Sequence, residues 1–175
     1  MTRDAEHCHH HHVAPLIIST IELGAAKLGI CALPGSSRSL ESDLETIADW
    51  QASVVVSLTE QAEMDAVGSG DIGQRTSDIG LTWHHLPIPD FGHLEEKDAG
   101  RWSTLAKVLH ADLDQGKKVL VHCRGGMGRS GMIVMRLLVE RGMLAEDAVS
   151  RIRSIRPGAV ETDAQYAWAA DGESE

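Results

Sequence analysis

The chain has 175 residues, 42% of them hydrophobic and 24% charged, with a formal net charge of −10. This length allows one domain with a substantial core, and the acidic balance argues against nucleic acid or an anionic membrane as the main partner. Three cysteines at unrelated spacings make no disulfide framework, and no apolar run is long enough to span a bilayer. We therefore expect a cytoplasmic globular protein.

The first 13 residues are rich in histidine, with Cys8 among the imidazoles from His7 to His12. Imidazole and thiolate are good transition-metal ligands. The segment is polar, terminal and without periodicity, so we interpret it as a disordered or tag-like tail and assign no metal site. A single domain is expected over residues 14–170, followed by an acidic tail over 171–175.

Apolar runs and periodic apolar residues alternate along the rest of the chain. Strands are predicted at residues 16–18, 28–33, 53–58, 81–86 and 119–121. Helices are predicted at residues 40–50, 61–67, 102–113, 129–139, 144–155 and 164–170, whereas 71–78 forms a short helix or a loop. This alternation predicts an α/β fold with a mostly parallel central sheet flanked by helices, which binds ligands at the carboxyl ends of its strands.

Single residues add detail to these elements. Ser39 is a typical N-cap for the first helix, and Thr59 is the candidate cap of the second. Gly116 ends the long helix, and residues 87–92 should form an exposed loop. Cys31 lies inside a strand pattern and is expected to pack in the core.

The segment KVLVHCRGGMGRSG, residues 118–131, joins a buried strand to an apolar helix through a glycine-rich loop. Such a loop directs successive backbone N–H groups at an anion, and the helix macrodipole adds positive charge there. Both effects favour the thiolate of Cys123, and Arg129 offers a planar fork for two phosphoryl oxygens. The expected phosphate-binding residues are Arg124, Gly125, Gly126, Met127, Gly128 and Arg129.

One pattern in this segment resembles the signature of the cysteine-dependent protein tyrosine phosphatases, which include the dual-specificity group: His122-Cys123, five further residues, then Arg129-Ser130. The resemblance implies a protein tyrosine phosphatase-like fold of dual-specificity size, with Cys123 as nucleophile and a cysteinyl-phosphate intermediate. It also implies that the Ser130 hydroxyl stabilises the sulfur as a leaving group and that His122 orders the loop from the strand. We expect turnover without a metal ion or cofactor.

A general acid is also needed, because the departing ester oxygen must receive a proton. Asp90 is the candidate, since it follows the strand at 81–86 and lies between Pro89 and Phe91. In the phosphatase family the acid occupies this kind of loop. Asp90 is alternatively a turn-capping aspartate, in which case Asp98 is the fallback acid.

Within the family, the chain is most similar to the kinase-associated phosphatase group, which implies a kinase as a partner. The similar segments are residues 28–35, 84–90, 122–130, 158–160 and 165–166. The family commonly places a glutamine after the Gly-Ala-hydrophobic turn to orient the hydrolytic water, where this chain has Glu161. Gln165 shares a helix face with Glu161 and is the candidate substitute. A carboxylate beside a phosphate is expected to slow the second step.

Charge limits the substrate. The variable loop positions carry Arg124 as their only cation, which favours phosphoproteins or phosphopeptides over phosphoinositides. With one Tyr and one Phe in the chain, we expect a shallow cleft that accepts phosphotyrosine and phosphoserine/threonine. Two alternatives remain open. The first is a rhodanese-like sulfurtransferase, which would leave Arg129 and Asp90 unexplained. The second is a phosphate-reading or kinase-binding module with vestigial catalysis. Such modules tend to lose the cysteine, the arginine or the acid, and this chain retains all three.

Overall fold

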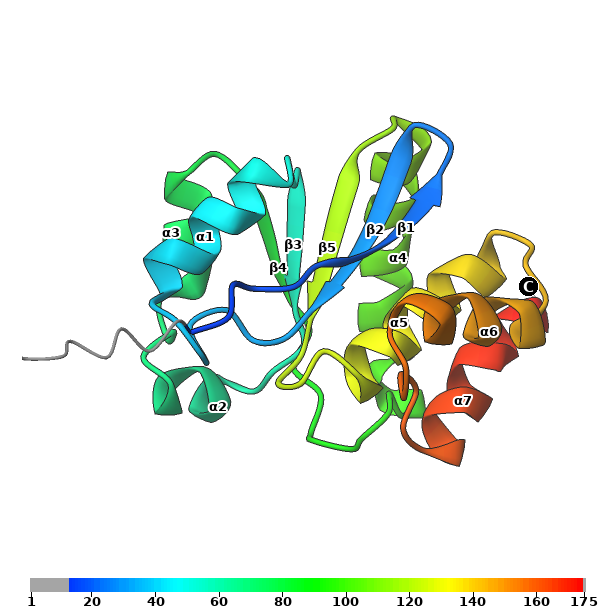
Figure 1. The fold of residues 1–175 in the computed structure, drawn as a ribbon. Helices are drawn as coiled ribbons and strands as arrows, with labels where there is room; N and C mark the ends of the chain where they lie inside the picture. The colour runs from blue at the N-terminus through cyan, green and yellow to red at the C-terminus, as the bar shows by residue number, and fades with distance from the viewer. Residues whose placement is uncertain (1–12, 175) are drawn as a thin grey trace, which may run out of the picture.

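The computed structural model describes residues 13–174, so the histidine-rich segment and its candidate ligands lie outside the described residues (Figure 1). Five strands form one sheet in the order β1-β2-β5-β3-β4. The strands are β1 (Ser19–Leu23), β2 (Ala26–Cys31), β3 (Val54–Ser57), β4 (Thr82–His85) and β5 (Lys118–His122). Strand β1 runs antiparallel to β2, and the other neighbours pair in parallel. The predicted mostly parallel sheet is therefore confirmed.

Helices cover both faces of this sheet (Figure 1). They are α1 (Leu40–Asp49), α2 (Gln61–Ala66), α3 (Ile72–Asp78), α4 (Ala99–Asp114), α5 (Gly128–Glu140), α6 (Ala145–Ile155) and α7 (Asp163–Ala170), with 3₁₀ turns at Glu96–Asp98 and Asp171–Ser174. Helices α1 and α3 lie on one side, and α4 to α7 on the other. The predicted α/β fold flanked by helices is confirmed, and residues 71–78 contain a helix.

Side-chain alternation along the strands divides the interior into two cores. Val55 and Leu120 face the core that includes helix α1, together with the fully buried Cys31. Val119 and Val121 face the larger core beneath α4, α5 and α6. Because β5 is central and buried on both faces, the loop that follows it starts from a rigid position.

Two local expectations are wrong. Residues 16–18 form no strand: Leu16 and Ile18 pack on the α1 core while Ile17 is 66% exposed, so this run contributes apolar contacts without joining the ladder. Helix α2 is capped by Glu60 in place of Thr59, because the side chains of Glu60 and Glu63 form a capping box. The N-cap role of Ser39 is confirmed, since its hydroxyl accepts from the N–H of Ser42 at 3.2 Å.

Over residues 13–174, none of the helices has both the length and the apolar character that crossing a membrane requires.

Candidate active site

The glycine-rich loop leaves the carboxyl end of β5 at Cys123 and enters α5 at Gly128. Cys123 is 3% exposed, and its Sγ lies 3.3 Å from the hydroxyl oxygen of Ser130. Gly126 has φ +68°, and a Cβ there would come within 2.5 Å of the carbonyl group of Cys31. Both the backbone conformation and the space require glycine at this position.

Donors outside the loop hold its carbonyl groups. Arg156 donates from Nε to the Gly126 oxygen at 2.8 Å and from Nη2 to the Gly125 oxygen at 3.1 Å. The N–H of Val160 donates to the Met127 oxygen at 3.2 Å. In a trans peptide unit the N–H points opposite to the carbonyl, so these contacts turn the loop's N–H groups inward. The bracing role of Arg156 was not predicted.

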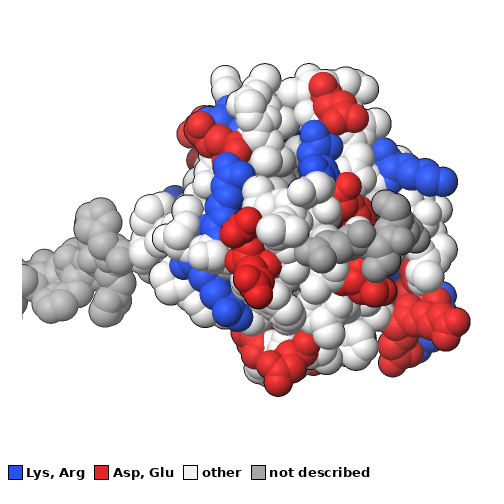
Figure 2. Space-filling view, turned by 90° about the vertical axis from the view of Figure 1, so that its right-hand side faces the viewer, with Lys and Arg blue, Asp and Glu red and all other residues white. Residues whose placement is uncertain are grey.

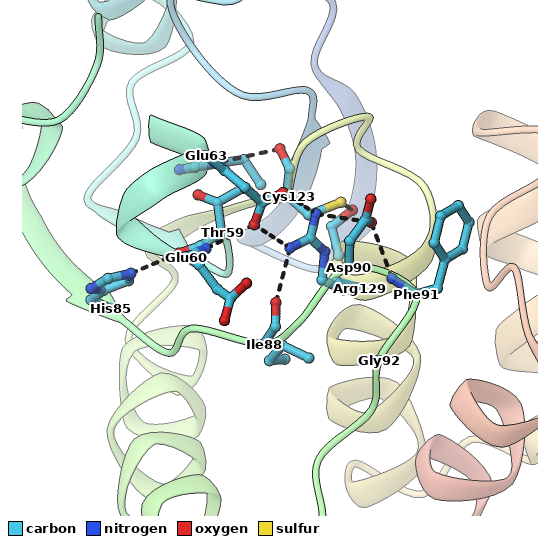
Figure 3. A network of polar contacts seen from close by, with 12 residues as sticks. Thr59, Glu60, Glu63, His85, Ile88, Asp90, Phe91, Gly92, Cys123 and Arg129 are labelled. Atoms are coloured by element: carbon cyan, nitrogen blue, oxygen red, sulfur yellow. Dashed lines mark hydrogen bonds and ion pairs between the residues drawn. The ribbon is translucent and has the colours of Figure 1, made fainter. Parts of the chain in front are cut away.

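Arg129 is 2% exposed, and its Nη1 and Nη2 groups contact four acceptors (Figure 3). Glu63 on α2 binds both groups, at 2.7 Å from Nη1 and 2.8 Å from Nη2. Nη1 also donates to the carbonyl of Ile88 at 2.9 Å, and Nη2 lies 3.1 Å from Oδ1 of Asp90. The structure thus brings Asp90 to Arg129, and it adds a second carboxylate that was not predicted.

Charge and burial act together on this cluster. The hydrogen bond from Arg129 lowers the pKa of Glu63 below its ordinary value, although burial opposes this. Burial alone would lower the pKa of Arg129, but the hydrogen bond to Glu63 and the charges of Cys123, Glu63 and Asp90 outweigh it and raise the pKa. Glu63 therefore holds the guanidinium charged and in a fixed plane.

The loop after β4 presents the candidate acid at the surface. The Asp90 side chain is 52% exposed, and Oδ1 accepts from the N–H of Phe91 at 3.0 Å. Phe91 has φ +57° and is 63% exposed, so the loop displays an aromatic ring beside the acid that was not predicted. Ile88 is fully buried, so only part of the expected exposed loop is exposed. Asp98 instead bonds to Arg101 and to the N–H of Glu95, and contacts none of these site residues.

His122 is fully buried behind the loop. Its Nε2 lies 2.6 Å from the hydroxyl of Ser57 on β3, and its Nδ1 lies 3.4 Å from the carbonyl oxygen of Cys123. Burial is the largest cause that lowers the pKa of His122 to about 4. The imidazole is consequently neutral near physiological pH and is directed along the sheet.

Gln165 on α7 connects this helix to the loop that carries Asp90. Its Nε2 donates to the Gly92 carbonyl at 3.0 Å, and its Oε1 accepts from the N–H of Glu161 at 2.9 Å. A Cβ on Gly128 would lie 3.0 Å from Gln165 Oε1 and 3.2 Å from the carboxyl carbon of Glu161. Both predicted supporting residues therefore border the glycine-rich loop at the start of α5.

In the part of the chain that the structure describes, no group of three His, Cys, Asp or Glu side chains is arranged to hold a metal ion. What the site combines is a thiol, an anion-binding loop, a guanidinium and a carboxylate. This set can bind a dianion and attack it with sulfur, and the carboxylate can then move the proton.

Comparison with known proteins gives consistent matches. A family model described as "Polymorphic toxin system, DSP-PTPase phosphatase" matches residues 29–143. The mouse cyclin-dependent kinase inhibitor 3 is 29% identical over 163 residues, which cover 87% of this chain and 76% of the relative. The bovine protein tyrosine phosphatase type IVA 3 is 32% identical over 127 residues, covering 73% and 68%.

Solved structures agree with the sequence matches. A crystal structure of kinase-associated phosphatase, with its catalytic-site cysteine replaced by serine, superposes with a TM-score of 0.80. The two are 25% identical, and the match covers 90% of this chain and 94% of that chain.

Proposed function

The chain belongs to the DSP-PTPase family of protein-tyrosine and dual-specificity phosphatases, and we propose that it hydrolyses phosphate monoesters through a cysteinyl-phosphate on Cys123. The observation that carries this proposal is the meeting of a thiol, a guanidinium and an acid at one anion-binding loop. Cys123 and Arg129 lie at the two ends of that loop, and Asp90 contacts the guanidinium.

In the first step, the Cys123 thiolate attacks phosphorus, so that an S–P bond forms and the P–O bond to the substrate breaks. Asp90, after it has left Arg129 and taken up a proton from solvent, donates that proton to the departing oxygen, which leaves as an alcohol or phenol. The inward N–H groups of the loop and Arg129 stabilise the charge on the three remaining oxygens.

Phosphate binding requires a rearrangement at Arg129. Its Nη1 group donates to Glu63 and Ile88, its Nη2 group donates to Glu63, and Asp90 forms an ion pair with Nη2 at 3.1 Å. Among the described residues, neither Nε nor the second hydrogen of Nη2 has a hydrogen-bond acceptor. A phosphate that binds Nε and Nη2 meets the Asp90 carboxylate beside Nη2, and repulsion between the two anions can turn the carboxyl group toward the leaving oxygen.

In the second step, water attacks the phosphocysteine, Asp90 accepts the water proton, and the S–P bond breaks. The Ser130 hydroxyl, 3.3 Å from Sγ, can donate a hydrogen bond to the departing thiolate. We propose that Gln165 helps to position the water, since its side chain borders Gly128. Glu161 borders the same residue, and its negative charge repels a phosphoryl group bound there.

The enzyme acts on phosphorylated substrates, and we propose phosphoproteins with phosphotyrosine or phosphoserine/threonine. The exposed Phe91 can pack on an aromatic leaving group without enclosing it. On the described part of the face that carries α6 and α7, acidic and basic side chains are interspersed, which does not favour a polyanionic surface as partner (Figure 2). We propose a kinase as a protein partner from the names of the relatives, and a cytoplasmic location because the thiol needs a reducing compartment.

Hydrolysis of p-nitrophenyl phosphate in a chelating buffer tests the proposal. We expect turnover without added metal and loss of turnover in Cys123→Ser. A rapid acid quench should trap phosphorylated protein, with the phosphate attached to Cys123. Binding of phosphopeptides without any turnover would instead identify a phosphate-reading module. Metal-dependent activity that survives Cys123→Ser would contradict the proposed chemistry.

A further inference from the structure

Three polar side chains on neighbouring strands form a chain of contacts that ends at the catalytic cysteine. Trp83 on β4 donates from Nε1 to the hydroxyl oxygen of Ser57 on β3 at 2.9 Å. The same oxygen lies 2.6 Å from Nε2 of His122 on β5, and Nδ1 of His122 lies 3.4 Å from the carbonyl oxygen of Cys123. The order β5-β3-β4 in the sheet places the three side chains in this sequence.

Trp83 determines the directions of the hydrogen bonds in this series of contacts. An indole N–H can only donate, so Trp83 uses a lone pair of the Ser57 oxygen. The Ser57 hydroxyl has one hydrogen, and it is fully buried beside Nε2 of His122. If Ser57 donates to Nε2, each polar group from Trp83 to the Cys123 carbonyl has a hydrogen-bond partner. The single proton of the neutral imidazole then lies on Nδ1, facing the Cys123 carbonyl.

The opposite tautomer is less favourable on two counts. A proton on Nε2 would leave the Ser57 hydrogen without an acceptor among the described residues, in a place closed to water. It would also direct the lone pair of Nδ1 at the lone pairs of the Cys123 carbonyl. A buried unsatisfied polar group costs more free energy than an ordinary hydrogen bond contributes.

We propose that Trp83 and Ser57 are positioning residues of the active site, which fix His122 as the Nδ1–H tautomer and so orient the Cys123 peptide. The Cys123 carbonyl and the N–H of Arg124 belong to one planar trans unit. When the carbonyl is held toward His122, this N–H points the opposite way, toward the anion site. A rotated peptide would present a carbonyl lone pair where an amide hydrogen now stabilises negative charge. This inference rests on the proposed role of Cys123 as nucleophile.

Trp83→Phe tests the proposal because it removes the N–H and keeps an aromatic ring. Trp50→Phe is the matched control: its Nε1 also donates to a hydroxyl, that of Thr20 at 3.1 Å, and it has no contact with His122. Ser57→Ala is a second variant that removes the central hydroxyl. Long-range ¹H–¹⁵N spectra of ¹⁵N-histidine-labelled protein report the tautomer directly, and the His122 signal is identified by its absence in His122→Gln.

We expect the Nδ1–H tautomer in the wild type and in Trp50→Phe, and a share of the Nε2–H tautomer in Trp83→Phe and Ser57→Ala. In these two variants kcat should fall about three- to ten-fold and inhibition by inorganic phosphate should weaken by a similar factor, the effect of one hydrogen bond. An Nε2–H tautomer in the wild type would overturn the proposal. So would unchanged tautomer and kinetics in both variants. If the wild type has the expected tautomer but no phosphatase activity, the assignment of the tautomer stands and the proposed function fails.

Discussion

Oδ1 of Asp90 lies 3.1 Å from Nη2 of Arg129, so the candidate general acid contacts the guanidinium that is expected to hold the substrate. The contact joins an exposed, strained loop to a buried residue at the start of α5. It places acid and phosphate site within one side-chain length of each other.

Asp90→Ala should separate the two roles of this carboxylate. Loss of a general acid should lower kcat about 10²- to 10⁴-fold with an alkyl phosphate, whose leaving oxygen needs the proton. Inorganic phosphate should bind at least as tightly, because it no longer competes with Asp90 for Nη2. Steady-state kinetics and isothermal titration calorimetry measure both. Asp98→Asn is the control and should keep wild-type kcat; a large fall there would move the acid to Asp98.

Glu63→Gln should weaken the hold on Arg129. The amide cannot give the guanidinium two charged acceptors, so we expect kcat/KM to fall about ten-fold or more through a less fixed Arg129. Asp65→Asn, on the same helix and bonded to Gln61, should have no such effect. Equal kinetics in Glu63→Gln and wild type would show that Glu63 does not position the guanidinium.

The same variant should alter the pH dependence of stability. Because the folded-state pKa of Glu63 is below its ordinary value of 4.5, its stabilising contribution is present above pH 4.5 and disappears as pH falls through the folded-state pKa. The melting temperatures of wild type and Glu63→Gln should therefore differ most near neutrality and converge at lower pH. A difference that stays constant with pH would exclude this charge as its origin.

His122 should make the protein less stable in acid. Its pKa drops from 6.5 to about 4 on folding because burial disfavours the cation, so the unfolded chain binds the proton first as pH falls below 6.5. Between about pH 7 and about pH 5 this residue should remove about 2 kcal/mol from the free energy of unfolding. Urea titrations at both pH values should show that loss reduced in His122→Gln and retained in His93→Gln, a change at an exposed position.

Glu161→Gln should speed hydrolysis of the phosphocysteine, because it removes a carboxylate beside a second anion at Gly128. Stopped-flow measurements with p-nitrophenyl phosphate should show a smaller burst and a faster steady state. Asp163→Asn, at an exposed acid in the first turn of α7 and two residues after Glu161, should behave as the wild type. A burst that does not change in Glu161→Gln would mean that Glu161 leaves the second step unaffected.

The sequence was sufficient where a signal is local. Ser39 as a cap, the central β5 strand and the loop from Cys123 to Gly128 follow from residue types at fixed spacing. Helix α2 shows the limit of such signals. Threonine is a favoured N-cap residue, yet the helix begins one residue later, with Glu60 as N-cap in a capping box with Glu63.

Contacts between distant segments could not be predicted. Glu63 and Arg129 are 66 positions apart, and no motif relates them. Glu63 caps α2 and also binds the guanidinium of Arg129. A glutamate in the first turn of a helix is accounted for by capping alone, so nothing in the sequence indicates its second contact. Arg156 was missed for a related reason: its acceptors are backbone carbonyls, which every residue carries.

The fit of Gly126 against the Cys31 carbonyl also limits how this enzyme can be diversified. Position 126 admits no side chain, whereas a Cβ at Gly125 would meet its nearest neighbour, Met127 Cγ, at an ordinary 3.8 Å. Arg124 is exposed. A randomised library aimed at new substrates should therefore yield active clones with changes at 124 and 125, while every survivor keeps glycine at 126.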